Sequence, residues 1–447
     1  MEDVLLWQWI IVIGVSVILF FIAPWSNTPA AFFRATKENQ QPNWLLLTSS
    51  LVISWIFAKS ITNAANLGLS FGFVGGVAYT GYYLSFVVAG VIIYQLRTKG
   101  GFTSIHHFLQ SRYGRSAVLV FSILIGFRLF NEVWSNTMVI GTYFGEQGST
   151  SYFTSIIVFT LLTLAYSLKG GLSSSLLTDA IQMALFGVLL FIILGVLIPK
   201  TEGGLTTYIQ SGEWSLGTGV NLLLVALLQS LSYPFHDPVL TDRGFISSPK
   251  TTLKAYLWAA PIGALCILLF SFVGIYAQQQ GMEGQAAVEV SKTLGVFMML
   301  MMNFIMVTSA ASTLDSTFAS FSKLAVVDLG TERKITVKRG RLAMVTLTII
   351  GTIPVFLSPE ILSGTTVSGT MVIGLAPVFI FWRRAAKPIA FHLSVGLGVV
   401  LGIALVMNWL PESWIFFPGK YGDLLSINLI GTLGCFLIFF AAGKRKK

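Results

Sequence analysis

Two stretches decide the fold: residues 49–68, which read SSLVISWIFAKSITNAANLG, and residues 222–245, which read LLLVALLQSLSYPFHDPVLTDRGF. Each begins as an apolar membrane segment and then turns polar. The first carries Lys59 with several polar side chains after it, and the second carries Pro234 and Pro238. Proline removes a backbone donor and clashes with the preceding helical turn. Because uncovered backbone groups are not tolerated in lipid, such interruptions survive only against protein or a wet cavity. We therefore predict two broken membrane helices.

The composition of the whole chain agrees with a membrane protein. Of its 447 residues, 54% are hydrophobic and only 10% are charged, whereas a soluble domain carries about 25% charged residues. This excludes an ordinary soluble enzyme, and high hydrophobicity excludes disorder. The two cysteines, Cys266 and Cys435, lie in apolar runs and provide neither a disulfide framework nor a metal-ligand cluster. No catalytic motif is present, so we expect no enzyme.

A helix that crosses about 30 Å of hydrocarbon needs about 20 apolar residues. About thirteen stretches of the chain meet this requirement, which predicts an all-α polytopic membrane protein. They cover residues 6–24, 44–67, 72–95, 115–145, 151–168, 175–199, 218–238, 254–277, 293–325, 341–357, 361–382, 388–410 and 423–442. No loop is long enough for a soluble domain, so residues 1–447 are expected to form a single transmembrane domain.

The distribution of basic residues predicts the orientation of these spans. With the N-terminus outside, 23 of the 28 Lys and Arg residues fall in inside loops or the C-terminal tail, three fall outside, and two lie within spans. An excess of Lys and Arg marks cytoplasmic loops. We therefore predict an N-terminus outside and a C-terminus inside the cytoplasmic membrane. The formal net charge of +10 then reflects topology, and we expect no nucleic-acid partner.

The two broken spans are the second and the seventh, and because five helices separate them they cross the membrane in opposite directions. This predicts two five-helix repeats of inverted topology, at residues 44–199 and 218–382. A leading helix at 6–24 precedes them, and two trailing helices follow at 388–442. Interrupted segments in corresponding positions point to a transport site near the midplane. Ordinary proline kinks are the alternative interpretation.

Hydroxyl groups recur on one stripe of the ninth predicted span. They belong to Ser309, Ser312, Thr313, Ser316 and Ser320, spaced i, i+3, i+4, i+7 and i+11. Hard cations prefer oxygen ligands, so the stripe fits a Na⁺ site, with Asp315 nearby. A packing face of small residues explains the same pattern. In the sixth span, Asp179 is either a charge favoured by a helix N-terminus or a cation ligand.

Three further charged residues lie within spans. Arg128 and Glu132 are spaced i, i+4, so we expect them to pair on one helix face. Lys59 lies too deep to reach the interface easily. Its open roles are an internal salt bridge to Asp315, Asp179 or Glu132, contact with an anionic group of a solute, and replacement of a bound cation. The last role would make transport proton-linked, because a buried lysine readily changes protonation state.

Four motifs resemble the sodium:solute symporter family, which includes the proline, galactose/glucose, sialic acid and pantothenate carriers. The motifs are FTSIHHFLQSRYG (102–114), the pattern GG-L-x-x-x-L-x-TD-x-x-Q (170–182), HDPVLTDRGF (236–245) and AASTLDS (310–316). The resemblance implies the inverted-repeat fold of the leucine-transporter class, with one leading and two trailing helices. The predicted spans have the same layout.

The resemblance also implies site residues. A principal Na⁺ site would use Ile56, Lys59, Ser309, Ser312 and Thr313. A second Na⁺ site, present in some members, would use Asp179, Ser312, Asp315 and Ser316. Solute contacts would come from Ser60, Asn63, Tyr82, Glu132, Ser232, Tyr233 and His236. Two positions depart from the family pattern: Lys59 replaces a neutral or acidic residue, and Ser309 replaces an alanine.

These features together predict a secondary active transporter. We expect Na⁺-coupled symport of a small polar solute, such as an amino acid, a sugar or an organic acid, by alternating access. Two alternatives stay open from the sequence. One is a proton-coupled transporter that depends on Lys59, and the other is a transporter-like solute sensor without coupled flux.

Overall fold

The computed structural model describes residues 2–35, 41–330, 335–357 and 368–443. These residues form helices and loops and contain no β-strand, which confirms the all-α prediction. Among the described residues, ten helices are long and apolar enough to cross a membrane, and two apolar helices, Trp44–Ile53 and Val220–Gln229, are shorter. The chain is therefore a multi-pass membrane protein in architecture.

The predicted number of thirteen spans is not confirmed as it stands. The second and seventh predicted spans contain the two short helices, and residues 58–98 form one long apolar stretch in which two predicted spans follow each other. The first part of the eleventh predicted span, residues 361–367, lies outside the described residues. The rest of that span is interrupted by a turn at residues 372–374.

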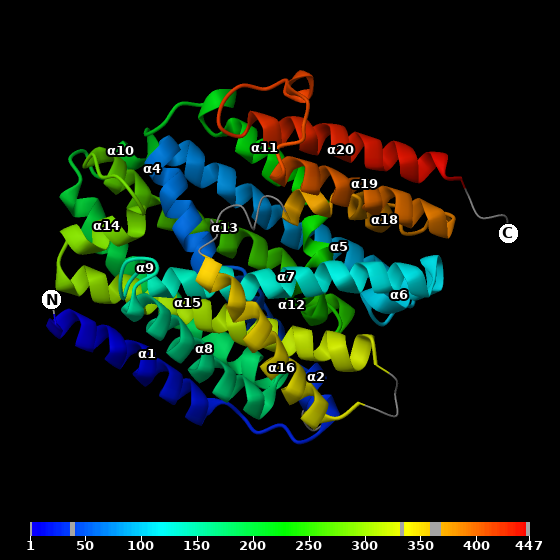
Figure 1. The fold of residues 1–447 in the computed structure, drawn as a ribbon, viewed down its shortest axis with the longest axis horizontal. Helices are drawn as coiled ribbons and strands as arrows, with labels where there is room; N and C mark the ends of the chain where they lie inside the picture. Colours follow the sequence, from blue (N-terminus) through cyan, green and yellow to red (C-terminus); the bar gives the residue numbers. More distant parts are fainter. Residues whose placement is uncertain (1, 36–40, 331–334, 358–367, 444–447) are drawn as a thin grey trace. The chain divides into compact units, whose positions relative to one another are not determined.

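The helices group into two compact units. The first unit comprises Met1–Gly76, Leu129–Gly212 and Leu265–Ile361. Its helices are α1 (Glu2–Ile22), α2 (Pro29–Arg34), α3 (Trp44–Ile53), most of α4 (Ala58–Thr80), the second part of α7 (Arg115–Gly141), α8 (Thr150–Gly170), α9 (Leu172–Lys200), α10 (Leu205–Ile209), the second part of α13 (Pro249–Gln279), α14 (Ala286–Thr293), α15 (Val296–Lys323) and α16 (Val337–Thr352). Within it, α15 packs against α1, α8, α9 and α16 (Figure 1).

The second unit comprises Val77–Arg128, Glu213–Ala264 and Leu362–Lys447. Besides the first parts of α7 and α13, its elements are the single turn η1 (Gly81–Tyr83), α5 (Leu84–Thr98), α6 (Ile105–Tyr113), α11 (Val220–Gln229), the turn η3 (Tyr233–His236), α12 (Pro238–Arg243), α18 (Leu375–Ile380), α19 (Pro388–Val406) and α20 (Gly422–Ala441). Helices α19 and α20 lie side by side, and α11 packs against α20 (Figure 1).

The first predicted helix break is confirmed. Helix α3 begins at the N-cap Asn43, whose side chain accepts from the Leu46 N–H, and it ends at Ile53. Residues 54–57 leave the helical path, and α4 begins at Ala58. This first break contains no proline, and the Ser54, Trp55 and Ile56 N–H groups donate to carbonyls of the last turn of α3.

The second predicted break is also confirmed, and it has a different construction. Helix α11 ends at Gln229, a turn follows, and η3 and α12 are short helices. Pro234 and Pro238 lie at the starts of η3 and α12, where a missing N–H costs nothing. Asp237 caps α12 by accepting from the Val239 and Leu240 N–H groups at 3.0 and 3.3 Å.

A bend at Gly72 separates the second and third predicted spans within α4. Its φ of 60° lies in a region that glycine adopts readily. The Phe73 N–H donates to the Ser211 carbonyl and hydroxyl at 3.1 and 3.0 Å. A Cβ at Gly72 would lie 2.7 Å from the Gly212 nitrogen, so the bend needs glycine for both conformation and space.

Candidate functional site

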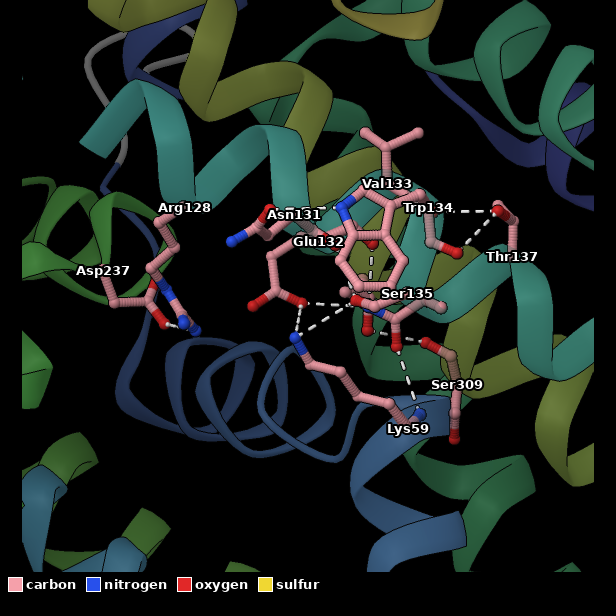
Figure 2. A network of polar contacts seen from close by, with 12 residues as sticks. Lys59, Arg128, Asn131, Glu132, Val133, Trp134, Ser135, Thr137, Asp237 and Ser309 are labelled. Carbon is pink, nitrogen blue, oxygen red and sulfur yellow. Dashed lines mark hydrogen bonds and ion pairs between the residues drawn. The ribbon is translucent and has the colours of Figure 1, made fainter. Parts of the chain in front are cut away.

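A buried ion pair lies directly after the first break. The Lys59 ammonium is 2.8 Å from Glu132 Oε2, and both side chains are 3% exposed. It also lies 3.3 Å from the Ser135 hydroxyl, as Figure 2 shows. A buried charge is retained when it is paired and hydrogen-bonded. Of the roles open to Lys59, the structure therefore shows an internal salt bridge, and Glu132 is its partner.

Helix α7 also holds the start of α4. The Asn136 side-chain oxygen accepts from the Lys59 backbone N–H at 3.3 Å, and its amide nitrogen donates to Glu132 Oε2 at 2.9 Å. The first N–H groups of a helix have no partner within the helix, and Asn136 satisfies one of them from a neighbouring element. One side chain thus joins the backbone at the break to the ion pair.

Arg128 has an acidic partner that the sequence did not predict, and its predicted pairing with Glu132 stays a prediction. Arg128 Nη2 donates to Asp237 Oδ2 at 2.8 Å. Its Nη1 donates to the Tyr233 hydroxyl at 2.6 Å, and the guanidinium lies 4.7 Å from the Tyr233 ring centroid. Each of the two side chains meets an opposite charge on another element, Glu132 at Lys59 and Arg128 at Asp237. Arg128 thereby fastens the second break within the second unit (Figure 2).

A group of buried hydroxyls surrounds Asp179 on α9. Asp179 Oδ1 accepts from Ser312 of α15 at 2.5 Å, and Oδ2 accepts from Ser50 of α3 at 2.5 Å. We define the Asp179 cluster as Ser50, Ser54, Ser175, Asp179, Ser312 and Ser316. All of these side chains are buried. The cluster joins α3, the first break, α9 and α15 through oxygen atoms alone.

Hydroxyl contacts link the remaining members of the Asp179 cluster. Ser54 lies 3.2 Å from both Asp179 Oδ2 and the Ser316 hydroxyl, and Ser175 lies 2.8 Å from the Ser316 hydroxyl. The sequence analysis missed Ser50, Ser54 and Ser175. The i, i+4 spacing of Ser50 with Ser54, and of Ser175 with Asp179, was the signal that could have found them.

The predicted second Na⁺ site is brought together in part. Asp179, Ser312 and Ser316 belong to one cluster, whereas Asp315 Oδ2 accepts from Thr178 at 2.8 Å. Of the predicted principal site, Ser312 donates to Asp179, and the Thr313 hydroxyl donates to the Ser309 carbonyl at 2.9 Å. The Ser309 hydroxyl is buried without a hydrogen-bond partner. Ile56 lies buried within the break itself.

The chemistry of these groups suits a monovalent cation. Among the described residues, no three or more His, Cys, Asp or Glu side chains gather where they could hold a metal ion. The Asp179 cluster instead combines one carboxylate with five serine hydroxyls. A hydroxyl that donates to a carboxylate keeps lone pairs for a cation. The donor set therefore fits an ion that needs neutral oxygens and one negative charge.

The predicted solute contacts divide between the two units. Ser60, Asn63 and Glu132 belong to the first unit, and the others belong to the second. In the second unit, the Tyr82 hydroxyl donates to Gln229 Oε1 at 3.0 Å, and the Ser232 hydroxyl donates to the Gln229 carbonyl at 3.2 Å. His236 Nδ1 lies 2.6 Å from the Tyr233 carbonyl. These side chains take part in the structure around the second break.

No family model matches the chain. The chain is 22% identical over 458 residues to sodium/glucose cotransporter 1 of Oryctolagus cuniculus, a match that covers 86% of the chain and 68% of that protein. It is 23% identical over 184 residues to sodium/glucose cotransporter 1 of Mus musculus, a match that covers 40% of the chain and 26% of that protein.

Solved structures resemble the chain over nearly its whole length. A Na⁺-coupled sialic acid symporter in a substrate-bound outward-open state has a TM-score of 0.72 at 16% identity, covering 98% of this chain and 97% of that one. Mhp1, a nucleobase-cation-symport-1 family transporter in a closed conformation, has a TM-score of 0.60 at 12% identity, covering 93% of this chain and 95% of that one.

The fold therefore defines the class: the chain has the architecture of helical membrane transporters of the leucine-transporter type, as the motifs predicted. The proteins that it resembles are cotransporters and symporters. The repeat boundaries at residues 44–199 and 218–382 stay a prediction.

Proposed function

We propose that the chain is a secondary active transporter of the sodium:solute symporter family. It carries a small polar solute, such as an amino acid, a sugar or an organic acid, together with Na⁺ across the cytoplasmic membrane. The single observation that carries the proposal is the Asp179 cluster. There a buried carboxylate and five serine hydroxyls join the first break to α9 and α15.

The negative charge of Asp179 is buried among the hydroxyls of the cluster. A buried carboxylate is costly unless it is compensated, and the Ser50 and Ser312 hydroxyls offset part of that cost. A Na⁺ ion among the same oxygens would neutralise the charge directly. The Thr313 hydroxyl, the Ser309 carbonyl and the Ile56 carbonyl are further candidate ligands on α15 and at the break. Bound Na⁺ would then stabilise the conformation in which these elements lie together.

Coupling follows from this preference. An ion can shift a conformational equilibrium only by its difference in affinity for the two states. If bound Na⁺ raises the solute affinity by some factor, bound solute raises the Na⁺ affinity by the same factor. Na⁺ at the break would favour the state with a formed solute site, for which Ser60, Asn63 and Glu132 are candidate contacts in the first unit. Alternating access then moves ion and solute together. The N-terminus-outside orientation stays a prediction from the basic residues.

The test is uptake into proteoliposomes. Candidate amino acids, sugars and organic acids are screened with and without an inward Na⁺ gradient, and we expect accumulation of one class only with the gradient. If uptake of the cognate solute is the same with and without the Na⁺ gradient, the proposed Na⁺ coupling is wrong.

A variant then tests the ligands. The pair Ser312→Ala and Thr313→Ala removes two hydroxyls, and we expect at least a tenfold rise in the Na⁺ concentration for half-maximal uptake, equal to about 1.4 kcal/mol. The matched control is Ser291→Ala with Thr308→Ala, whose buried hydroxyls donate to carbonyls three or four residues away. Unchanged Na⁺ dependence in the first pair would reject these ligands.

The Lys59–Glu132 ion pair favours a second candidate, a proton-coupled transporter. A lysine beside a carboxylate at the break, 2.8 Å away, can exchange a proton during transport and so take the place of a coupling cation. This version predicts uptake driven by a pH gradient and lost in Lys59→Met, with Lys59→Arg as the charge-conserving control. A solute sensor without coupled flux predicts tight solute binding and no uptake under either gradient.

A further inference from the structure

A surface cavity in the second unit uses none of the residues assigned to ion or solute binding. Its volume is about 260 Å³, and one wall is Tyr94 of α5. The remaining lining comes from the first turns of α13, namely Lys250, Leu253, Lys254, Leu257 and Trp258. One water occupies about 30 Å³ in the liquid, so the cavity can accommodate a group of several non-hydrogen atoms.

Close packing of α5 and α13 forms this cavity. A Cβ added at Gly90 of α5 would lie 2.7 Å from the Tyr256 Cβ of α13, so the two helices touch at that point. Tyr94 lies one turn further along α5, and Lys254 lies two residues before Tyr256. The cavity walls are therefore supported by a tight helix contact and belong to ordered helices rather than to loops.

The charge around the cavity is positive. Lys250 and Lys254 are exposed and one turn apart on α13, so their ammonium groups can reach one ligand. Neither α5 nor α13 contains an acidic residue. The lining residues themselves include two lysines and no acidic side chain. An anion is the ligand that this charge favours.

The other end of the cavity is apolar and faces outward. Leu257 is 43% exposed and Trp258 is 51% exposed, and both lie one turn beyond Lys254. Tryptophan and tyrosine collect at the membrane interface, where an aromatic ring meets a polar tip. The order along α13 is therefore charge first and apolar surface second, which matches the order of headgroup and acyl chain in a phospholipid.

We propose that this cavity binds an anionic phospholipid, with the lipid phosphate between Lys250 and Lys254 and an acyl chain along Leu257 and Trp258. The basic residues of this end of α13 are predicted to lie on the cytoplasmic side, where anionic lipids attract basic residues by about 1 kcal/mol each. A free phosphate ion has the same headgroup chemistry, but it would leave the exposed leucine and tryptophan without a partner.

The test is native mass spectrometry of the full chain in detergent, titrated with phosphatidylglycerol or phosphatidylcholine of the same chains. We expect one molecule of phosphatidylglycerol to bind with higher affinity than any further molecule, and no molecule of phosphatidylcholine to show such preferred binding. The double variant Lys250→Gln with Lys254→Gln should weaken phosphatidylglycerol binding about 30-fold, or about 2 kcal/mol. Lys250→Arg with Lys254→Arg should retain binding.

A matched pair and a competitor complete the design. Lys338→Gln with Arg339→Gln removes two exposed charges from the start of α16 and should leave phosphatidylglycerol binding unchanged. Trp258→Ala should weaken binding of phosphatidylglycerol without affecting binding of inorganic phosphate. Equal phosphatidylglycerol binding in the wild type and the double glutamine variant would overturn the proposal, as would full displacement of the lipid by millimolar inorganic phosphate. Because the readout is lipid binding, it is independent of Na⁺ coupling.

Discussion

The two helix breaks differ in what holds them open. At the second break, Pro234 and Pro238 start new short helices, Asp237 caps one of them, and Arg128 binds Asp237 and Tyr233. The first break has no proline. Its polar groups meet Asn136 and Glu132 of α7, Asp179 of α9 and Ser316 of α15.

The second break is therefore specified by prolines in its own sequence, whereas the first break depends on side chains from other helices. Proline kinks or breaks a helix by removing a backbone donor, so the second break is favoured by its own sequence. The first break depends on hydrogen bonds and an ion pair that a cation or a solute can replace. The proposed function places ion binding at the first break, and we expect a fixed structural role for the Arg128–Asp237 pair at the second. The predictions below test that division.

The largest expected effect comes from Arg128→Met. It leaves the Asp237 carboxylate, only 2% exposed, without its guanidinium partner, and loss of one partner of a buried ion pair costs about 3–5 kcal/mol. We expect that decrease in the free energy of unfolding, measured by chemical denaturation in detergent. Arg383→Met, which removes an exposed arginine, serves as the control.

A double variant sharpens this result. Arg128→Met with Asp237→Asn removes both charges and should recover at least half of the lost stability, because no unpaired charge stays buried. If the double variant is as unstable as Arg128→Met alone, the ion pair does not determine the stability of the second break.

The next effect concerns the first break. Asp179→Asn keeps the size of the side chain but removes the negative charge of the Asp179 cluster. We expect Na⁺ affinity to fall about 100-fold, equal to about 2.8 kcal/mol, in Na⁺-dependent uptake or in direct Na⁺ binding by calorimetry. Asp237→Asn should change stability and leave Na⁺ affinity within about threefold, or about 0.7 kcal/mol. If Asp237→Asn lowers Na⁺ affinity and Asp179→Asn changes only stability, ion binding belongs to the second break and not to the first.

The smallest effect is expected at Tyr82. Its hydroxyl donates to Gln229 Oε1 at the end of α11, so Tyr82→Phe should lower the free energy of unfolding by about 1 kcal/mol. Tyr143→Phe is the matched control, because the Tyr143 hydroxyl is buried without a hydrogen-bond partner and its removal should cost nothing. If Tyr82→Phe changes solute affinity more than stability, Tyr82 contacts the solute as the sequence predicted.

Much of the architecture could be predicted from the sequence. The apolar length of the segments, the two prolines Pro234 and Pro238, and the polar run from Lys59 onward are local properties. They located most helices and both breaks within a few residues. The motif around Asp179 and the hydroxyl stripe on α15 also identified part of one cluster. Ser50, Ser54 and Ser175 escaped notice because serine is common on helix faces that merely pack.

What the sequence by itself determined is the set of segments that enter the membrane and the two places where a helix must stop. Only the tertiary structure decided which charges meet. Lys59 pairs with Glu132, and Arg128 pairs with Asp237, which is 109 residues away in the chain. The physical reason is that helix formation depends on neighbours in the chain, whereas a buried charge takes the partner that long-range packing brings within about 3 Å.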